Sequence, residues 1–410
     1  MAIDGINPDA PRRPQIDERD SAALPRLWVE RITLTNFRNY AKATLEAGPE
    51  PVVLAGANGA GKTNFLEAVS LLAPGQGLRR AVFTDLASAN GDGSWAVAAR
   101  VHTHLGGVEI GTGLAPGALS ETSRGSGRPA GRIVRIDGAT KGGSGALGEY
   151  VELVWVTPAM DGLFTGPASE RRRFLDRLIL CFDPAHAKLA GRFERAMQSR
   201  NRLLADGVRD AAQFSGLELI LAESGVALAA ARMEAVAALR DIVMERRERD
   251  AASPFPWSEI AIDGALEIDL AARPAVDVED SYARRLQQNR ERDRAAGRTL
   301  EGPHRSDLTV GHGPNAMAAR LCSTGEQKAL LLGLVLAHAE LVASRRSGLA
   351  PLLLLDEITA HLDEHRRAAL FTEILRLKCQ AWMTGTDAEA FAPLGGKARI
   401  LRIENGRVLP

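Results

Sequence analysis

PVVLAGANGAGKTNFLEAVSLLA, residues 51–73, joins a short apolar run to a glycine-rich loop and then to a segment with apolar residues at helical spacing. The first run suits a buried strand, and the loop fits the pattern G-x-x-x-x-G-K-[ST] from Gly56 to Thr63. Glycines let consecutive backbone N–H groups curl around phosphate oxygens at a helix N-terminus. In that arrangement Lys62 reaches the terminal phosphates and the Thr63 hydroxyl binds Mg²⁺. The stretch therefore predicts a P-loop, with a chance glycine-rich turn as the alternative.

A second motif, PLLLLDE at residues 351–357, is an apolar run that ends in two acids. Asp356 is placed to hold Mg²⁺, directly or through water, and Glu357 to polarise an attacking water. Taken alone, the run equally fits a buried strand that ends at a capping aspartate. A P-loop in the same chain favours the nucleotide interpretation. We therefore predict ATP and Mg²⁺ as cofactors, Lys62, Asp356 and Glu357 as catalytic residues, and Thr63 and Asp356 as metal ligands.

A third motif, STGEQ at residues 323–327, stands directly in front of a strongly apolar helical pattern. Ser323 offers a hydroxyl, Gly325 allows close approach of another backbone, and a helix N-terminus attracts anions. In P-loop ATPases of the ABC and SMC type, a loop of this kind completes the ATP site of a second protomer. The alternative is a capping box, in which Ser323 or Thr324 caps the helix and Glu326 or Gln327 reaches back. The two interpretations are compatible.

The strand and helix patterns predict an α/β fold that is interrupted by a helical insertion. The expected parts are a disordered tail over residues 1–25, the N-terminal part of a head over 26–167, a mostly helical arm over 168–298, and the C-terminal part of the head over 299–410.

Within these parts, strands are predicted at 28–37, 95–101, 108–113, 132–138 and 151–156, and a polar, mobile loop at 118–131. Helices are predicted at 185–205, 216–249 and about 279–296. The sequence IAIDGALEIDL predicts a small β element that turns at Asp263–Gly264.

The bulk composition narrows the class of protein. The 410 residues contain 51 Lys+Arg and 51 Asp+Glu, so any surface for nucleic acid must come from local clustering of charge. The three cysteines form no CxxC pair, which argues against a disulfide framework and favours a reducing compartment. No uncharged apolar run reaches the ~18 residues of a membrane span. We therefore expect a cytoplasmic protein without a membrane partner.

Six segments in order carry a more specific resemblance: LTNFRNY from residue 34, GANGAGKTNFLEAV from 56, TPAMDGLFTGPASERRRFLD from 157, GPHRSDL from 302, STGEQK from 323 and LLLLDEITAHLDEHRR from 352. Together they resemble the RecF family of recombination mediators, whose ATPase head is of the SMC/ABC type. The resemblance runs from about residue 27 to the end. It implies a mixed sheet with helices in the head, and an inserted arm.

The resemblance also implies an activity. Members of the family bind ATP and DNA, dimerise with two nucleotides between their heads, and act as weak DNA-dependent ATPases. With RecR and RecO they help to load RecA at gapped DNA during recombinational repair and replication restart, including the SOS response. By position, the residues expected to contact nucleotide are Arg38, Gly56, Ala57, Asn58, Gly59, Ala60, Gly61, Lys62, Thr63, Asn64, Ser323, Gly325, Gln327 and Asp363.

Two positions depart from the pattern of ABC-type heads. The glutamine that usually follows a core strand near VELVWVTP is replaced, with Val154 as the expected equivalent. The histidine after the last core strand is also missing, and MTGTDAEA offers Thr384, Thr386 and Asp387 in its place. Weaker positioning of water follows from both changes, so we predict slow hydrolysis that serves as a switch.

Arginine clusters are the candidates for DNA contact. Residues 165–204 hold nine basic residues against four acidic ones, and arginine suits phosphate because of its planar donor fork. The named candidates are Arg79, Arg80, Arg171, Arg172, Arg173, Arg192 and Arg195, with His304–Arg305 as a further possibility. For the 171–173 run, a solvated helical face with some of these arginines ion-paired inside the junction between the domains is an equally good interpretation. Aromatic residues are only 5% of the chain, so backbone contact with duplex is favoured over stacking on single strands.

Two other classes of protein were weighed. A transport-associated ATPase keeps roughly a hundred residues between its P-loop and the loop that corresponds to STGEQ, which is called the signature. In this chain Lys62 and Ser323 are 261 positions apart (323 − 62). A P-loop kinase needs no signature loop. A nucleotide-free scaffold is disfavoured because Lys62, Thr63 and both acids at 356–357 are intact.

Overall fold

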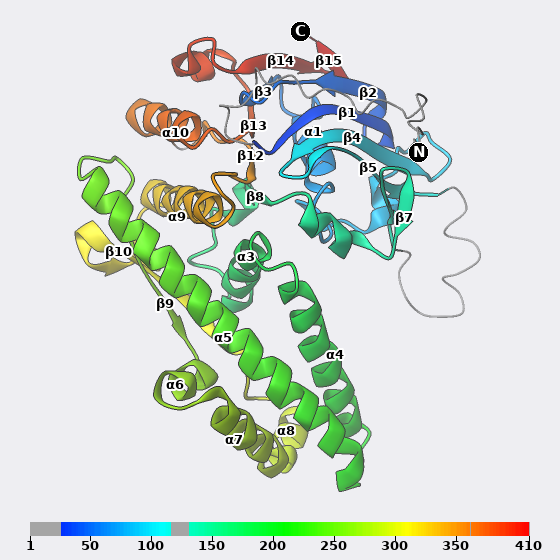
Figure 1. Cartoon of the computed structure of the whole chain (residues 1–410), viewed down its shortest axis with the longest axis vertical. Helices are drawn as coiled ribbons and strands as arrows, with labels where there is room; N and C mark the ends of the chain where they lie inside the picture. The colour runs from blue at the N-terminus through cyan, green and yellow to red at the C-terminus, as the bar shows by residue number, and fades with distance from the viewer. Residues whose placement is uncertain (1–25, 116–130, 361, 410) are drawn as a thin grey trace, which may run out of the picture.

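A computed structural model describes residues 26–115, 131–360 and 362–409 (Figure 1). The tail predicted over 1–25 and nearly all of the loop predicted at 118–131 lie outside these ranges. The sheets of the head lie at one end of the molecule, and the long helices α4 (His186–Ala205) and α5 (Ala211–Arg249) extend away from them (Figure 1). All the strands predicted for the N-terminal part of the head are present.

The central sheet of the head positions the P-loop. Its order is β15-β14-β3-β13-β12-β8, and all but β15 run parallel. Parallel strands collect their carboxyl ends at one edge, where ligands of open α/β sheets bind. The strands are β3 (Val52–Ala55), β8 (Leu153–Val156), β12 (Leu352–Leu355), β13 (Ala381–Gly385), β14 (Arg399–Glu404) and β15 (Arg407–Leu409).

A second, antiparallel sheet of six strands covers the P-loop helix α1 (Lys62–Ser70). The core between the two sheets includes Phe65, whose ring lies 5.7 Å from that of Tyr40 and 5.9 Å from that of Trp382. These contacts fix α1 against both layers. The strands are β1 (Trp28–Phe37), β2 (Tyr40–Glu46), β4 (Trp95–Thr103), β5 (Gly106–Leu114), β6 (Ile133–Ile136) and β7 (Ala139–Lys141), in the order β2-β1-β4-β5-β6-β7.

The other face of the parallel sheet packs on helices. Helix α9 (Thr324–Arg345) is buried along most of its length in this core, which explains why its sequence is so apolar. The core also takes residues from α3 (Ala168–Leu180), α10 (Glu364–Leu377) and the C-terminal half of α5. The four strands β3, β8, β12 and β13 are buried on both faces, so they read as continuous apolar runs.

The arm has its own small core. Phe193 of α4, Leu221 and Val226 of α5, and Tyr282 of α7 (Ala275–Gln288) meet there. Helix α5 contributes to this core with its N-terminal half and to the head core with its C-terminal half, so it links the two. The division at residues 168 and 298 stays a prediction from the sequence.

Two expectations for the arm are wrong in detail. The segment IAIDGALEIDL does not form a β turn element: β9 (Ser258–Asp263) is followed by helix α6 (Ala265–Ala272), and β9 pairs with β10 (Asp307–His312). The two-residue strand β11 (Met317–Ala318) completes this third sheet. The charged helix expected at 279–296 is two helices, α7 and α8 (Arg290–Ala296), because Asn289 leaves the helix and donates to Glu301 at 3.1 Å.

Candidate nucleotide site

The P-loop connects the end of β3 to the start of α1, as predicted. Two glycines have conformations that disfavour any other residue: Gly61 has φ 116°, and Gly56 has φ 154°, where a Cβ would lie 2.3 Å from the Ile403 carbonyl oxygen. Lys62 Nζ donates to the carbonyl oxygens of Gly56 at 2.7 Å and Ala57 at 2.9 Å. The ammonium group is therefore held across the loop, at the N-terminus of α1.

The acids of the second motif lie beside the P-loop helix. Thr63 Oγ1 donates to Asp356 Oδ1 at 2.9 Å, which brings together residues 293 positions apart. Thr384, at the end of β13, donates to the same carboxylate oxygen at 2.8 Å and accepts from the backbone N–H of Glu357 at 2.7 Å. Glu357 has φ 48°, a left-handed conformation that is uncommon outside glycine and concentrates at functional sites. Thr384 thus fixes both acids at once.

The residues at this edge fit a magnesium ion. A hydroxyl and a carboxylate oxygen, on Thr63 and Asp356, are the hard ligands that Mg²⁺ prefers, and it takes its remaining ligands from phosphates and water. Burial lowers the pKa of Lys62, and the nearby charges of Glu357 and Asp356 oppose this shift.

The end of β8 lies next to Asp356. Its register with β12 shows that the prediction for Val154 is wrong. Val154 was expected at the position of the water-positioning glutamine, but it lies inside strand β8, where it pairs with Leu353 of β12 and is fully buried. Leu355 pairs with Val156, and Asp356 donates its N–H to the Val156 carbonyl oxygen at 2.9 Å. The next residue, at the carboxyl end of β8, is Thr157. Val154 therefore cannot face a nucleotide.

A polar network joins the turn after β1 to α1. Arg38 binds the Glu67 carboxylate with two hydrogen bonds, at 2.9 and 3.0 Å, and donates to the Asp85 carbonyl oxygen at 2.8 Å. Asn64 bridges Asn39 at 2.8 Å and Arg79 at 2.7 Å. Arg38 and Asn64, both expected at the nucleotide, therefore also brace the P-loop helix from outside.

The signature segment forms the capping box at the start of α9. Ser323 caps the helix, and the Glu326 carboxylate accepts from the backbone N–H of Ser323 at 2.8 Å. Ser323 is exposed, whereas Gln327 is buried and donates to the Cys322 carbonyl oxygen at 2.8 Å. The side chain of Gln327 thus holds the loop from inside and does not point to solvent.

The loop before α10 lies close to the signature. Asp363 caps α10 by accepting from the Arg366 N–H at 2.8 Å, and the Arg366 side chain reaches the Gly325 carbonyl oxygen at 3.4 Å. Within the described ranges, no hydrogen bond or ion pair joins residues 323–327 to the P-loop of the same chain. The signature segment and the P-loop are therefore not joined by such contacts within one copy of the chain.

The candidate arginines divide into three groups. Arg171 binds the Asp307 carboxylate with two hydrogen bonds of 2.8 Å, and Arg172 donates to the Ser306 carbonyl oxygen, so both serve the junction between head and arm. Arg192 and Arg195 are exposed on α4, where Arg192 pairs with Glu223 at 2.6 Å. The third group lines a cavity beside Thr63 and Asp356, and its members are Arg79, Arg80, Arg173 and Arg177. Arg200, counted in the basic run, is fully buried and cannot contact DNA.

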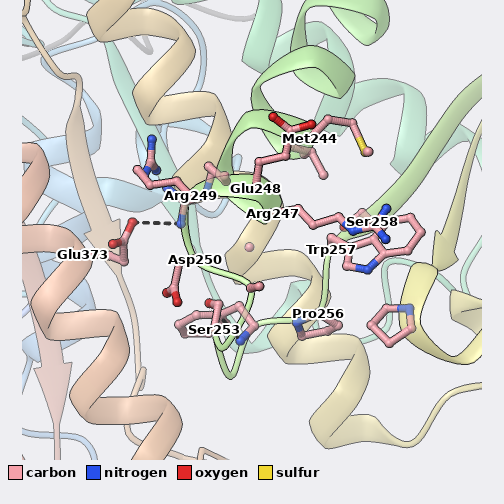
Figure 2. A pocket seen from close by; sticks show the side chains of 16 residues that line it. Met244, Arg247, Glu248, Arg249, Asp250, Ser253, Pro256, Trp257, Ser258 and Glu373 are labelled. Carbon is pink, nitrogen blue, oxygen red and sulfur yellow. Dashed lines mark hydrogen bonds and ion pairs between the residues drawn. The ribbon is translucent and has the colours of Figure 1, made fainter.

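A larger cavity of about 730 Å³ lies elsewhere, between the C-terminal end of α5 and helices α9 and α10 (Figure 2). Arg249 and Arg246 in its wall are neutralised by Glu340 at 2.7 and 2.8 Å, and Arg247 stacks on the Trp257 ring at 4.2 Å. No residue predicted to bind nucleotide lies in its lining.

Three residues of the site escaped sequence reasoning in whole or in part. The sequence gives no indication of a role for Thr157, because a single threonine after an apolar run matches no motif. Thr384 was noted only as a substitute for histidine, although it bonds to both acids. Lys328, buried on α9, lies 3.6 Å from Asp161 in the segment after β8 and links the signature helix to that segment. The available signal in the sequence was a lysine directly after STGEQ, at the start of a strongly apolar helical pattern.

The fold and this arrangement of motifs define the class: a P-loop ATPase head of the SMC type with a helical arm. The family model for the RecF/RecN/SMC N-terminal domain matches residues 28–406. The DNA replication and repair protein RecF of Mesorhizobium japonicum is 54% identical over 382 residues, which cover 93% of this chain and 97% of that protein. RecF of Brucella suis biovar 1 is 50% identical over 384 residues, covering 93% and 96%. The chain belongs to the RecF family.

Solved structures agree with this fold. A structure of the recombination mediator protein RecF with ATP, from the RecFOR pathway, superposes with a TM-score of 0.79 at 21% identity and covers 95% of this chain and 98% of that one. The Smc head domain of Pyrococcus furiosus superposes with a TM-score of 0.51 at 16% identity, covering 94% and 96%. The predicted architecture, an SMC-type head with an inserted arm, is confirmed.

Proposed function

We propose that this protein is an ATP-dependent DNA-binding protein of replication and repair, which binds ATP–Mg²⁺ between two copies of the chain and hydrolyses it slowly. The observation that carries the proposal is the pair of half-sites. One half-site holds Lys62 and the Thr63–Asp356 contact of 2.9 Å. The other is the exposed Ser323 at the N-terminus of α9.

The dimer follows from the chemistry of the two half-sites. The N-terminus of α9 carries a partial positive charge. The exposed Ser323 hydroxyl donates to the Glu326 carboxylate at 2.8 Å in the single chain, and in the proposed dimer it turns to a phosphate oxygen instead. ATP bound to the P-loop of one copy presents its terminal phosphate to this loop of a second copy, with Asp363 near the same interface. ATP then adds favourable contacts only to the dimer, and hydrolysis removes them, so nucleotide shifts the population between the two states.

The partners come from the relatives. The family relation supports DNA as a ligand, and the RecFOR pathway named for one solved relative supports RecR and RecO as partners. We propose that the protein acts with them in the cytoplasm to help load RecA at gapped DNA, and that DNA stimulates its weak ATPase. A transport-associated ATPase has no observation of its own in its favour.

Sedimentation tests the dimer. Wild-type protein with ATP–Mg²⁺ and gapped DNA is expected to sediment as a dimer, and without ATP as a monomer. Ser323→Arg is expected to bind ATP but to remain monomeric, because a bulky cation stands at the helix N-terminus that faces the phosphate. Lys62→Met is expected to lose ATP binding by at least about tenfold, the loss of a charge-assisted hydrogen bond to phosphate. Normal dimerisation of Ser323→Arg would remove the signature from the interface.

Replacing Thr384 with valine tests the positioning of the two acids. The change removes the hydrogen bond to Asp356 and leaves the Glu357 N–H without its acceptor. We expect ATP turnover to fall about tenfold, on the order of one to two kcal/mol in the barrier, while ATP affinity changes little. Thr384→Ser keeps the hydroxyl and should restore turnover. Thr140→Val makes the same change at an exposed position of β7 and is the matched control; equal rates for Thr384→Val and Thr140→Val would refute the role.

A further inference from the structure

We propose a second phosphate-binding site next to the nucleotide, formed by Arg80, Arg173 and Arg177. The proposal rests on the ATP site described above, because the cavity that these arginines line, about 410 Å³, also reaches Thr63 and Asp356. Two basic clusters that stand about ninety positions apart in the sequence meet here. One follows α1, and the other is on α3.

The cavity carries more positive than negative charge. Glu170 lies 3.2 Å from Arg173 and is the carboxylate of α3 in the lining. Over the described parts of the chain, no carboxylate lies within 4.0 Å of Arg80 or Arg177. Arg79, the fourth arginine of the lining, is already engaged by Glu67 at 3.5 Å and by Asn64. The lining of the cavity therefore holds more guanidinium groups than carboxylates.

Arg177 has a buried hydrogen-bond donor that no protein group in the described ranges accepts. Its guanidinium lies over the Trp155 ring, with 4.1 Å to the ring centroid, and over Phe174 at 5.5 Å. Its Nε is buried and has no hydrogen-bond partner, and Nη2 reaches only the Trp155 carbonyl oxygen at 3.4 Å and the Met160 sulfur at 3.6 Å. Arg177 as a whole is half-buried, but a buried N–H without an acceptor is costly unless a ligand completes it.

The three arginines also oppose one another. Burial lowers the pKa of Arg80, and the charge of Arg173 lowers it further, with Glu170 acting in the other direction. Burial and the charge of Arg80 lower the pKa of Arg177 to about 9. An anion in the cavity would reverse these charge effects on both arginines.

The ligand that fits is a phosphate. Guanidinium groups bind phosphate oxygens with paired hydrogen bonds, and Arg177, packed on Trp155 and Phe174, presents its guanidinium beside an aromatic wall. Two sources have this chemistry: inorganic phosphate leaving the nucleotide site, and a backbone phosphate of DNA. Either would lie against α3, whose Arg171 holds Asp307 at the junction with the arm.

The experiment uses the full chain with the double substitution Arg80→Ala and Arg173→Ala, both exposed side chains whose removal leaves the core intact. Three affinities are measured: a fluorescent ATP analogue, inorganic phosphate added to the ADP–Mg²⁺ complex by calorimetry, and duplex DNA over a series of salt concentrations. We expect ATP affinity to change less than about threefold. Affinity for one phosphate source is expected to fall at least about tenfold. Arg209→Ala with Arg240→Ala removes the same charge from exposed positions of the arm and is the control.

The outcomes separate the sources and the alternatives. A loss confined to inorganic phosphate identifies a product site. A loss for DNA, with the salt slope reduced by about 0.9 for each phosphate contact removed, identifies a DNA phosphate. Unchanged binding of both would overturn the proposal. A fall in ATP affinity above tenfold, with ADP unaffected, would also overturn it, since the arginines would then hold the terminal phosphate of ATP itself. Failure of the wild type to bind ATP would instead refute the proposed function.

Discussion

Replacing Glu357 with glutamine is expected to lower ATP turnover about 10²- to 10⁴-fold, the usual contribution of a general base, while ATP binding stays intact. Glu357 follows Asp356 at the end of β12, and its backbone N–H is held by Thr384 at 2.7 Å. Glutamine keeps the size of the side chain but cannot take a proton from water. The left-handed backbone of Glu357, φ 48°, costs energy and persists only where its surroundings impose it, which marks this residue as constrained.

Single-turnover hydrolysis with ATP in excess over its dissociation constant gives the rate, and a fluorescent nucleotide gives the affinity. Because hydrolysis releases the dimer in the proposed mechanism, Glu357→Gln should also sediment as a persistent ATP-bound dimer. Glu404→Gln makes the same chemical change on β14, at an exposed position. Turnover of Glu357→Gln at the wild-type rate would assign activation of water to another residue.

The parts of the site that the sequence predicted correctly are those in which the relevant contacts are local. The P-loop is a strand, a loop and a helix within about twenty residues, and the backbone conformations of Gly56 and Gly61 are encoded by glycine itself. The capping box at Ser323 and Glu326 spans four residues. Helices α4 and α5 follow from apolar residues at regular spacing, which a long segment makes unambiguous.

The register of the strands and the pairing of strands far apart in the chain could not be predicted from the sequence. The strand VELVWV is buried on both faces, so it has no alternation that shows where it ends, and the sheet-edge position fell on Val154 when the edge lies at Thr157. The segment IAIDGALEIDL fits both a strand and a helix over a few residues. Its β9 half finds its partner in β10, more than forty positions later, and that pairing leaves the rest free to form α6.

Arginines illustrate the same limit. Composition shows a basic run, but it cannot show that Arg171 meets Asp307, a residue 136 positions away. Nor can it show that Arg80 and Arg173 line one cavity. The alternative that part of this run is ion-paired at the junction of head and arm holds for Arg171. Arg192, by contrast, is exposed and paired only at the surface.

Arg200 gives the second large prediction. Its side chain is fully buried in the arm and joins four elements, with donor–acceptor distances of 3.1 Å to Glu218, 2.7 Å to Asp293, 2.9 Å to Thr299 and 2.7 Å to the Leu286 carbonyl oxygen. Arg200→Met removes the cation and leaves two buried carboxylates with fewer partners. Breaking a buried ion pair in this way costs about 3–5 kcal/mol, so the arm should unfold at markedly lower urea concentration.

Urea unfolding followed by hydrogen exchange in α4, α5 and α8 measures this loss where it occurs. Arg192→Met is the matched control, since its pair with Glu223 is exposed and such pairs contribute at most about 1 kcal/mol. Arg290 also binds Glu218, at 2.5 Å, so Asp293 is the carboxylate that loses more. Adding Asp293→Asn to Arg200→Met should therefore recover part of the stability, because it removes the unpaired charge. If Arg200→Met and Arg192→Met unfold at the same urea concentration, the buried network is not what holds the arm together.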